Sequence, residues 1–152
     1  MTPLRRVGGR EVTTLEGLAD EVRTAWAEAL LASGGSQCGF CTPGIVMRLA
    51  AEGRSGSSPN AVTEDQVERG LLAHLCRCTG WQTIEEAARI VRDEEEPRAS
   101  SDSNRDLEAA GARATLEGGA VQRVGADVVL GLAGFADDTT PPDASVAVPS
   151  SS

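Results

Sequence analysis

Lysine and tyrosine are absent from this sequence, histidine occurs once, and aromatic residues make up 3% of its 152 residues. With two Trp and two Phe, a packed core has to be built mainly from Leu, Ile, Val and Ala. Arg supplies all of the side-chain positive charge apart from the one His, and the formal net charge is −9. This acidic balance speaks against a nucleic-acid partner, which requires a basic face.

Long hydrophobic runs are also missing. No apolar run approaches the length that spans a membrane, and residues 1–6 lack the apolar stretch of a secretory signal. The sequence therefore predicts a cytoplasmic protein with no membrane partner. In such a reducing compartment, the four cysteines are better interpreted as ligands or redox groups than as two disulfides.

Composition divides the chain into four parts. Residues 1–14 form a tail, and residues 15–96 carry good apolar patterning and predict one helical domain. Residues 97–119 have no clear apolar stripe and are predicted to be a linker. Residues 120–152 begin with a short apolar stretch and end in a Pro-, Ser- and Asp-rich segment, 137–152, that is predicted to be disordered. The predicted fold class is all-α, a four-helix bundle with disordered or irregular flanks.

Helix-start signals and helical spacing predict four short helices in the domain. Capping boxes at Thr13–Glu16, Thr63–Gln66 and Thr83–Glu86 predict the starts of the first, third and fourth helices, and Thr42–Pro43 predicts the start of the second. Gly34 and Gly35 predict the end of the first helix. The expected apolar faces are Leu15, Leu18, Val22, Ala25, Trp26 and Ala29; Ile45, Val46, Leu49 and Ala50; Val67, Leu71 and Leu75; and Ile84, Ala87, Ala88 and Val91.

The cysteines form two close pairs, a C-x2-C pair at Cys38 and Cys41 and a C-x-C pair at Cys76 and Cys78. Four thiolates are the ligand set of a [2Fe–2S] cluster, with two on each iron. Each pair comes shortly before a predicted helix, whose N-terminal amides favour an anionic group. The sequence thus predicts a cluster between two helix starts.

Other ligand chemistries compete with this interpretation. Structural zinc also takes four cysteines, although it usually repeats C-x2-C. Spacing alone favours iron–sulfur over zinc, and both over disulfides. The C-x4-C-x2-C spacing of plant ferredoxins is absent, and a Rieske site needs two histidines where the chain has only His74. We interpret His74 as a surface or packing residue, and Arg77 either neutralises cluster charge or faces solvent.

The two cysteine motifs carry a family resemblance. Gln37–Gly44 reads QCGFCTPG, Leu75–Gly80 reads LCRCTG, and Thr14–Leu18 reads TLEGL. Together they resemble the helical [2Fe–2S] domain in the small iron–sulfur subunit of the xanthine oxidase family of molybdenum hydroxylases. The resemblance covers about Val12 to Val91. It implies that Cys38, Cys41, Cys76 and Cys78 bind the cluster.

The resemblance also implies a role and partners. The cluster would relay electrons away from a molybdopterin centre held by a large partner subunit, with a flavin subunit as a further partner. Gln37 and Cys78 match the residues that lie against the pterin in the family. Nothing in the sequence looks like a catalytic site, so we expect no catalytic residue on this chain.

The chain departs from the family at both ends. The family's ferredoxin-like domain, with a second cluster, would precede residues 1–14, and no cysteine occurs before Cys38. Near the other end, Gln122–Asp127 and Gly134–Asp138 are similar to the opening of the large, molybdopterin-binding subunit, which here stops at Ser152. Two alternatives therefore stay open beside electron transfer: a zinc-stabilised interaction module and a non-functional fragment of a broken oxidoreductase gene.

Overall fold

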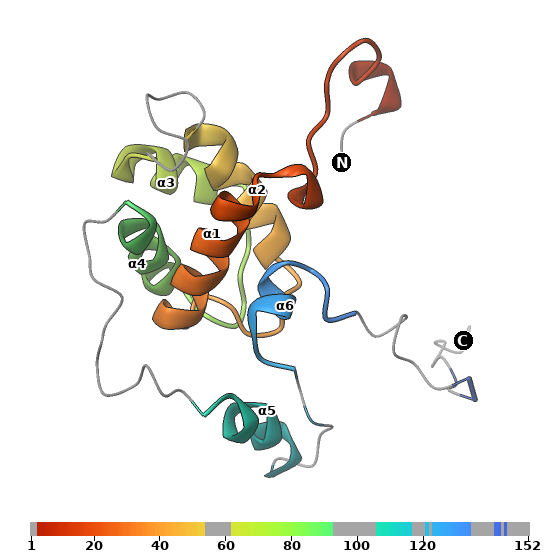
Figure 1. The fold of residues 1–152 in the computed structure, drawn as a ribbon, viewed down its shortest axis with the longest axis vertical. Coiled ribbons are helices and arrows are strands. Elements are labelled where there is room, and N and C mark those ends of the chain that lie inside the picture. The colour runs from red at the N-terminus through yellow and green to blue at the C-terminus, as the bar shows by residue number, and fades with distance from the viewer. Residues whose placement is uncertain are drawn as a thin grey trace, which may run out of the picture.

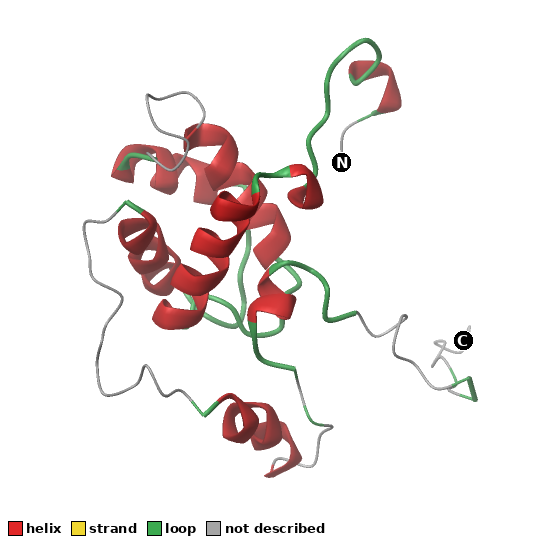
Figure 2. Ribbon diagram, viewed as in Figure 1, coloured by secondary structure: helices red, strands yellow, loops and turns green. Residues whose placement is uncertain are grey.

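A computed structural model describes residues 3–53, 62–92, 106–116, 121, 123–134, 142, 143 and 145 of the chain. Over these residues the structure contains helices and loops and no strand (Figure 2). The all-α prediction is confirmed. No helix within the described segments combines the length and the apolar character needed to cross a membrane.

Four substantial helices form the bundle seen in Figure 1: α1 (Asp20–Ser33), α2 (Thr42–Gly53), α3 (Glu64–Leu71) and α4 (Trp81–Val91). Two 3-10 turns, η1 (Leu4–Arg6) and η2 (Leu15–Gly17), precede them, and α5 (Leu107–Leu116) and α6 (Ala126–Val129) follow. The most extensive helix contacts are those of α1 with α4 and of α2 with α3. Since both pairings join elements around one cluster of buried side chains, the bundle has a single core.

The core is aliphatic, as the scarcity of aromatic residues predicts. Its largest fully buried side chain is Trp26, and among the described residues no other aromatic side chain lies in the core. The predicted faces of the second and fourth helices are buried throughout: Ile45, Val46, Leu49 and Ala50, and Ile84, Ala87, Ala88 and Val91. Burial of these apolar side chains is the main force that holds the helices together.

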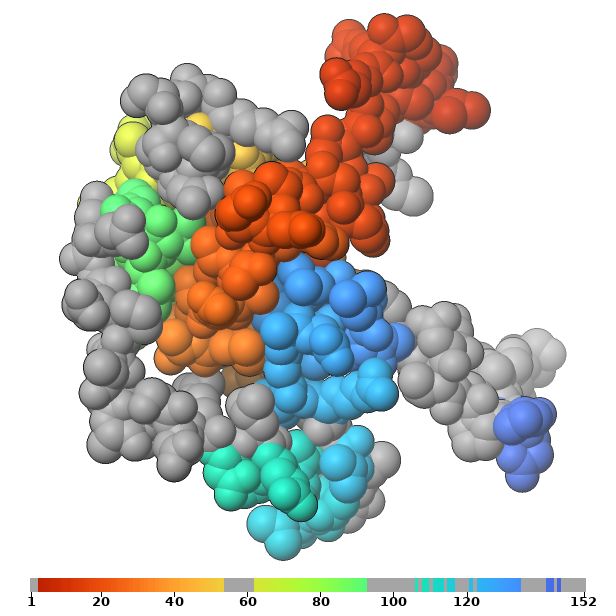
Figure 3. Space-filling view, viewed as in Figure 1, coloured from red at the N-terminus to blue at the C-terminus, as the bar shows by residue number. Residues whose placement is uncertain are grey.

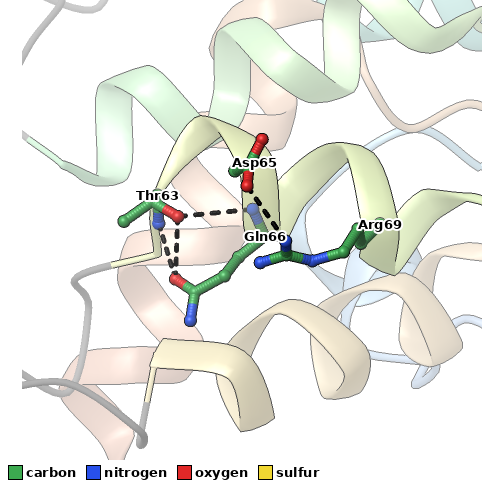
Figure 4. A network of polar contacts seen from close by, with 4 residues as sticks. All are labelled: Thr63, Asp65, Gln66 and Arg69. Carbon is green, nitrogen blue, oxygen red and sulfur yellow. Dashed lines mark hydrogen bonds and ion pairs between the residues drawn. The ribbon is translucent and has the colours of Figure 1, made fainter.

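The capping box at Thr63 forms as predicted (Figure 4). The Thr63 backbone N–H donates to Gln66 Oε1 at 2.8 Å, and the Gln66 N–H donates back to Thr63 Oγ1 at 3.3 Å. Gln66 also donates through Nε2 to the Glu52 carbonyl at 3.5 Å, which links α3 to α2. Arg69 and Asp65 make an exposed ion pair one turn apart on α3.

The other two predicted capping boxes are wrong. After η2 the backbone is extended at Leu18 and at Ala19, and α1 begins only at Asp20. Glu16 instead accepts hydrogen bonds from its own backbone amide and from Thr14, which hold its pKa below the usual value. At the fourth helix, Thr83 donates back to the Gly80 carbonyl at 2.9 Å, and α4 begins at Trp81, two residues before Thr83.

The prediction that Leu75 belongs to the core is also wrong. Helix α3 ends at Leu71, so the helical spacing does not continue to Leu75, whose side chain is 92% exposed. The earlier members of that face, Val67 and Leu71, are buried. The physical reason is that Leu72–Gly80 leaves the helix to bring the second cysteine pair to the site.

The part of the chain after α4 is more structured than its composition indicates. Helix α5 lies within the range predicted to be a linker, 97–119. Helix α6 packs on α1 and α2; its Val129 belongs to the hydrophobic core, and its Val128 is buried and contacts Gly39. The predicted disordered end, 137–152, lies outside the described residues except for 142, 143 and 145.

Candidate metal centre

The first cysteine pair lies in a loop between α1 and α2. Gly34 ends α1 in the left-handed conformation, with φ of 74°. A Cβ atom at Gly35 would lie 2.8 Å from Leu30 and 3.2 Å from the Thr83 carbonyl, so only glycine lets the loop approach α4 this closely. The loop is thereby held beside the start of α4, where the second pair of cysteines arrives.

A buried pair of hydroxyl groups closes this loop at its base. Ser36 Oγ and Thr42 Oγ1 are 3.3 Å apart, and both residues are buried. The Thr42 N–H also donates to the Gly39 carbonyl at 3.3 Å. Residues 37–41 therefore form a short loop with tied ends, which places Cys38 and Cys41 on one edge of the bundle.

The second pair lies in the segment Leu72–Gly80 between α3 and α4. Cys76 is half-buried and contacts the core, whereas Cys78 is exposed. Gly80 adopts φ of 80° immediately before α4, a conformation that glycine reaches without strain. This turn directs the chain from the cysteine segment into the helix.

The two segments place the sulfur atoms in two cross-loop pairs. Cys78 Sγ lies 3.4 Å from Cys38 Sγ. Cys41 and Cys76 hydrogen-bond to each other through their side chains. All four thiols are free in this structure. Each pair thus takes one cysteine from each segment, although the segments are far apart in the sequence.

Thr79 sets the ionisation of Cys76. Burial is the largest single influence on the Cys76 pKa and raises it, but hydrogen bonds from the Thr79 hydroxyl and amide, from the Cys78 amide and from Cys41 together outweigh burial and lower the pKa to about 7. The Thr79 Oγ1 lies 3.0 Å from Cys76 Sγ. A lowered thiol pKa favours the thiolate, which is the form that binds metals.

The other shifted thiols are held in the neutral form without a metal. Burial, followed by the hydrogen bond and the negative charge of Cys76, raises the pKa of Cys41 to about 12. The hydrogen bond with Cys38, followed by burial, raises the pKa of Cys78. Both shifts include repulsion between thiolates that lie close together, and a bound cation would offset that repulsion.

A helix begins shortly after each cysteine pair in the chain. Helix α2 begins at Thr42, directly after Cys41, and α4 begins at Trp81, three residues after Cys78. The Ile45 N–H donates to the Cys41 carbonyl at 3.0 Å as the first bond of α2. Positive partial charge at both helix N-termini stabilises negative charge on the thiolates and on any group they bind.

The donor set fits a [2Fe–2S] cluster better than a single metal ion. The four sulfurs lie as two cross-loop pairs, Cys38 with Cys78 and Cys41 with Cys76. Structural zinc requires four ligands around one centre. Two cysteine pairs instead match the requirement of two irons, each with two thiolates.

The remaining predicted residues lie at the edge of the site. Gln37 is exposed beside Cys38, and Arg77 is exposed between the second pair of cysteines. His74 is half-buried, and its ring packs 3.4 Å from where a Cβ of Gly44 would lie, at the start of α2. Of the surface or packing role predicted for His74, the packing role agrees with this position.

Two residues contribute to the site without having been predicted from the sequence. Thr79 hydrogen-bonds to Cys76. The only indication of this role in the sequence is that a residue with a hydroxyl group directly follows Cys78. Val128 packs directly on Gly39 from the far end of the chain, and no local pattern indicates that contact.

In this all-α unit, two loops that precede helices bring four thiols together. This arrangement defines a class of protein, the small helical metal-binding domains with cysteine ligands. Within that class the family is plain: residues 14–89 match the family described as "[2Fe-2S] binding domain", and the chain belongs to it. The resemblance to the iron–sulfur domain of the xanthine oxidase family is confirmed by this match and by the relatives below.

Curated relatives are xanthine dehydrogenases and aldehyde oxidases. The chain is 44% identical over 92 residues to "Xanthine dehydrogenase" of Oryza sativa subsp. japonica, covering 59% of this chain and 7% of that protein. It is 39% identical over 94 residues to one subunit of a probable xanthine dehydrogenase of Bacillus subtilis, covering 62% of this chain and 53% of the relative.

A third relative, "Aldehyde oxidase 1" of Cavia porcellus, is 44% identical over 92 residues, which is 59% of this chain and 7% of that protein. The chain thus spans about half of the bacterial relative and a small part of the two eukaryotic proteins. No solved structure gives a significant match.

Proposed function

We propose that Cys38, Cys41, Cys76 and Cys78 bind one [2Fe–2S] cluster, with Cys38 and Cys78 on one iron and Cys41 and Cys76 on the other. The observation that carries this proposal is the pairing of sulfurs across the two loops, 3.4 Å apart for Cys38 and Cys78. Close approach of two sulfurs is what a shared iron requires, and Thr79 keeps one thiol of the second pair ready to ionise.

The function we propose is electron transfer within a molybdenum hydroxylase of the xanthine dehydrogenase and aldehyde oxidase type. The names of the relatives support this assignment. When bound, the cluster supplies the capacity to take up and release one electron. The chain's own residues set its surroundings, because α2 and α4 begin shortly after Cys41 and Cys78 and the loops leave Cys38 and Cys78 at the surface.

We further propose that this surface receives a large molybdopterin-binding subunit, with a flavin subunit as a more distant partner. Three exposed apolar side chains support the proposal: Phe40 is 81% exposed, Leu75 92% and Trp81 38%. All three belong to the cysteine segments or directly follow them. Exposed apolar side chains beside a cofactor-binding segment are typical of an interaction site.

Gln37 and Cys78 are the residues we propose to lie nearest the pterin of that partner. Both are exposed on the same cysteine edge of the bundle. A reducing compartment such as the cytoplasm would keep the four thiols available for the cluster. We propose residues 15–96 as the helical [2Fe–2S]-binding domain, preceded by a tail, 1–14, and followed by a linker, 97–119, and by a segment, 120–152, that resembles the start of a molybdopterin-binding subunit.

The direct test is metal and sulfide analysis of anaerobically reconstituted protein. We expect about two irons and two sulfides per chain, no EPR signal in the oxidised form and an S = 1/2 signal after one-electron reduction. Each Cys→Ser variant is expected to lose iron, whereas His74→Ala serves as a control that retains it. Stoichiometric zinc without a visible chromophore would instead establish the zinc-stabilised interaction module.

A further inference from the structure

The segment of residues 123–134 returns to the bundle from outside the region that matches the family, which ends at residue 89. Its helix α6 lies against α1 and α2, and Figure 3 shows these blue residues in contact with orange ones of the bundle. Val129 is 0% exposed and belongs to the hydrophobic core. The segment is therefore anchored to the same core that supports the cysteine loops.

The anchored segment packs on the backbone between the first two cysteines. A Cβ atom at Gly39 would lie 2.5 Å from Val128 Cγ1 and 3.0 Å from the Val128 carbonyl oxygen. Gly39 also adopts φ of 78°, which disfavours any other residue. Hence the Gly39 peptide lies directly under Val128, and no side chain fits between them.

The segment is a closed loop that contacts the chain on both sides of Cys41. Arg123 Nη1 donates to the Ala133 carbonyl at 3.1 Å, and the Leu132 N–H donates to the Asp127 carbonyl at 2.7 Å. At its turn, a Cβ of Gly131 would lie 3.4 Å from the Pro43 ring, at the start of α2. A small hollow beside Cys38 is lined by Cys38, Gly39, Val128, Gly131, Ala133 and Gly134.

We propose that residues 123–134 are an intrachain clamp on the Cys38–Cys41 loop, and that Val128 is a positioning residue which fixes Cys38 relative to Cys78. The contacts at Gly39 and at Pro43 hold the loop on either side of Cys41. The role of Cys38 as a cluster ligand rests on the function proposed above. The clamp concerns only the backbone of the cysteine loop, so it does not depend on that function.

Hydrogen exchange in the full chain tests the clamp without any metal. We compare Val128→Ala with the matched control Leu132→Ala, which truncates an exposed side chain of the same segment. In Val128→Ala, exchange in the peptide covering residues 36–42 is expected to be about fivefold faster, since two buried methyl groups are lost. In the control it is expected to stay within about twofold of the parent. Equal exchange in the two variants would overturn the clamp.

Cluster retention in reconstituted protein gives the second readout. We expect Val128→Ala and Gly39→Ala each to speed loss of the cluster to a chelator. Because both changes disturb one contact, the double variant should lose the cluster less quickly than the product of the two single effects predicts. Multiplicative effects would show that Val128 does not act through Gly39.

The two readouts separate the clamp from the proposed function. If the parent takes up no iron while Val128→Ala still accelerates exchange at residues 36–42, the function is wrong and the clamp stands. If the parent holds its cluster with a normal EPR signal while Val128→Ala leaves both exchange and cluster loss unchanged, the clamp is wrong and the function stands.

Discussion

The Sγ atoms of Cys38 and Cys78 lie 3.4 Å apart, although the two residues are 40 positions apart in the chain. This approach depends on Gly35, which packs against the Thr83 carbonyl of α4, and on Gly80, which turns the second segment into the same helix. The close sulfur pair is therefore a product of helix packing, and it makes the behaviour of the metal-free protein predictable.

Mild oxidation of the metal-free protein is expected to form the Cys38–Cys78 disulfide first. Both cysteines are exposed, and their sulfurs need to move by only about 1.4 Å to reach the bond length of about 2.05 Å. Cys41 is half-buried and its pKa is raised to about 12, so its thiol stays neutral and the Cys41–Cys76 disulfide should form more slowly. Peptide mapping without reduction identifies the pairs, and a dominant Cys38–Cys41 disulfide would contradict the cross-loop arrangement.

Replacement of Thr79 is expected to change the pH dependence of Cys76. With the Thr79 hydrogen bonds in place the pKa of Cys76 is lowered from 9.0 to about 7, so the thiolate predominates above neutral pH. In Thr79→Val the side-chain bond is lost and the pKa rises, so alkylation of Cys76 in the metal-free protein should reach its midpoint at higher pH.

Thr79→Ser is the matched control, because it keeps the hydroxyl group. Its alkylation profile, followed by mass spectrometry over a pH series, should overlay that of the parent. A profile for Thr79→Val that also overlays the parent would mean that the hydroxyl does not stabilise the thiolate.

Removal of the metal is expected to lower the melting temperature while the protein stays helical. A ligand that binds only the folded form adds several kcal/mol at saturation, which corresponds to about 10 °C or more for a domain of this size. The helical circular dichroism signal should persist at room temperature, since no cysteine is among the fully buried core residues in the described part of the chain. Loss of that signal without metal would show that the helices depend on the cluster.

Two threonines that look alike in sequence are expected to differ in their effect on stability. Thr63→Ala removes an observed capping box, so the free energy of unfolding should fall by about 1 kcal/mol. Thr13→Ala serves as the comparison, because α1 begins at Asp20 and Thr13 lies well before it. Urea denaturation measures both, and an equal loss in the two variants would contradict the observed start of α1.

Much of the fold can be predicted from the sequence because it arises from local interactions. The faces of α2 and α4, the glycine that ends α1 and the capping box of α3 all depend on residues within a few positions of one another. The capping boxes expected at Thr13 and Thr83 do not form, and the cause is again local. Gly17, Leu18 and Gly80 adopt backbone conformations that the capping pattern does not take into account.

The sequence by itself determined that the chain is helical, that its core is aliphatic and that two cysteine pairs precede helices, because periodicity, composition and spacing are properties of neighbouring residues. Only the tertiary structure decided which sulfurs meet, that Leu75 is exposed, and that Val128 packs on Gly39. Those relationships join segments far apart in the chain. They depend on how whole helices pack, and packing is set by the shape of the complete core rather than by any local run of residues.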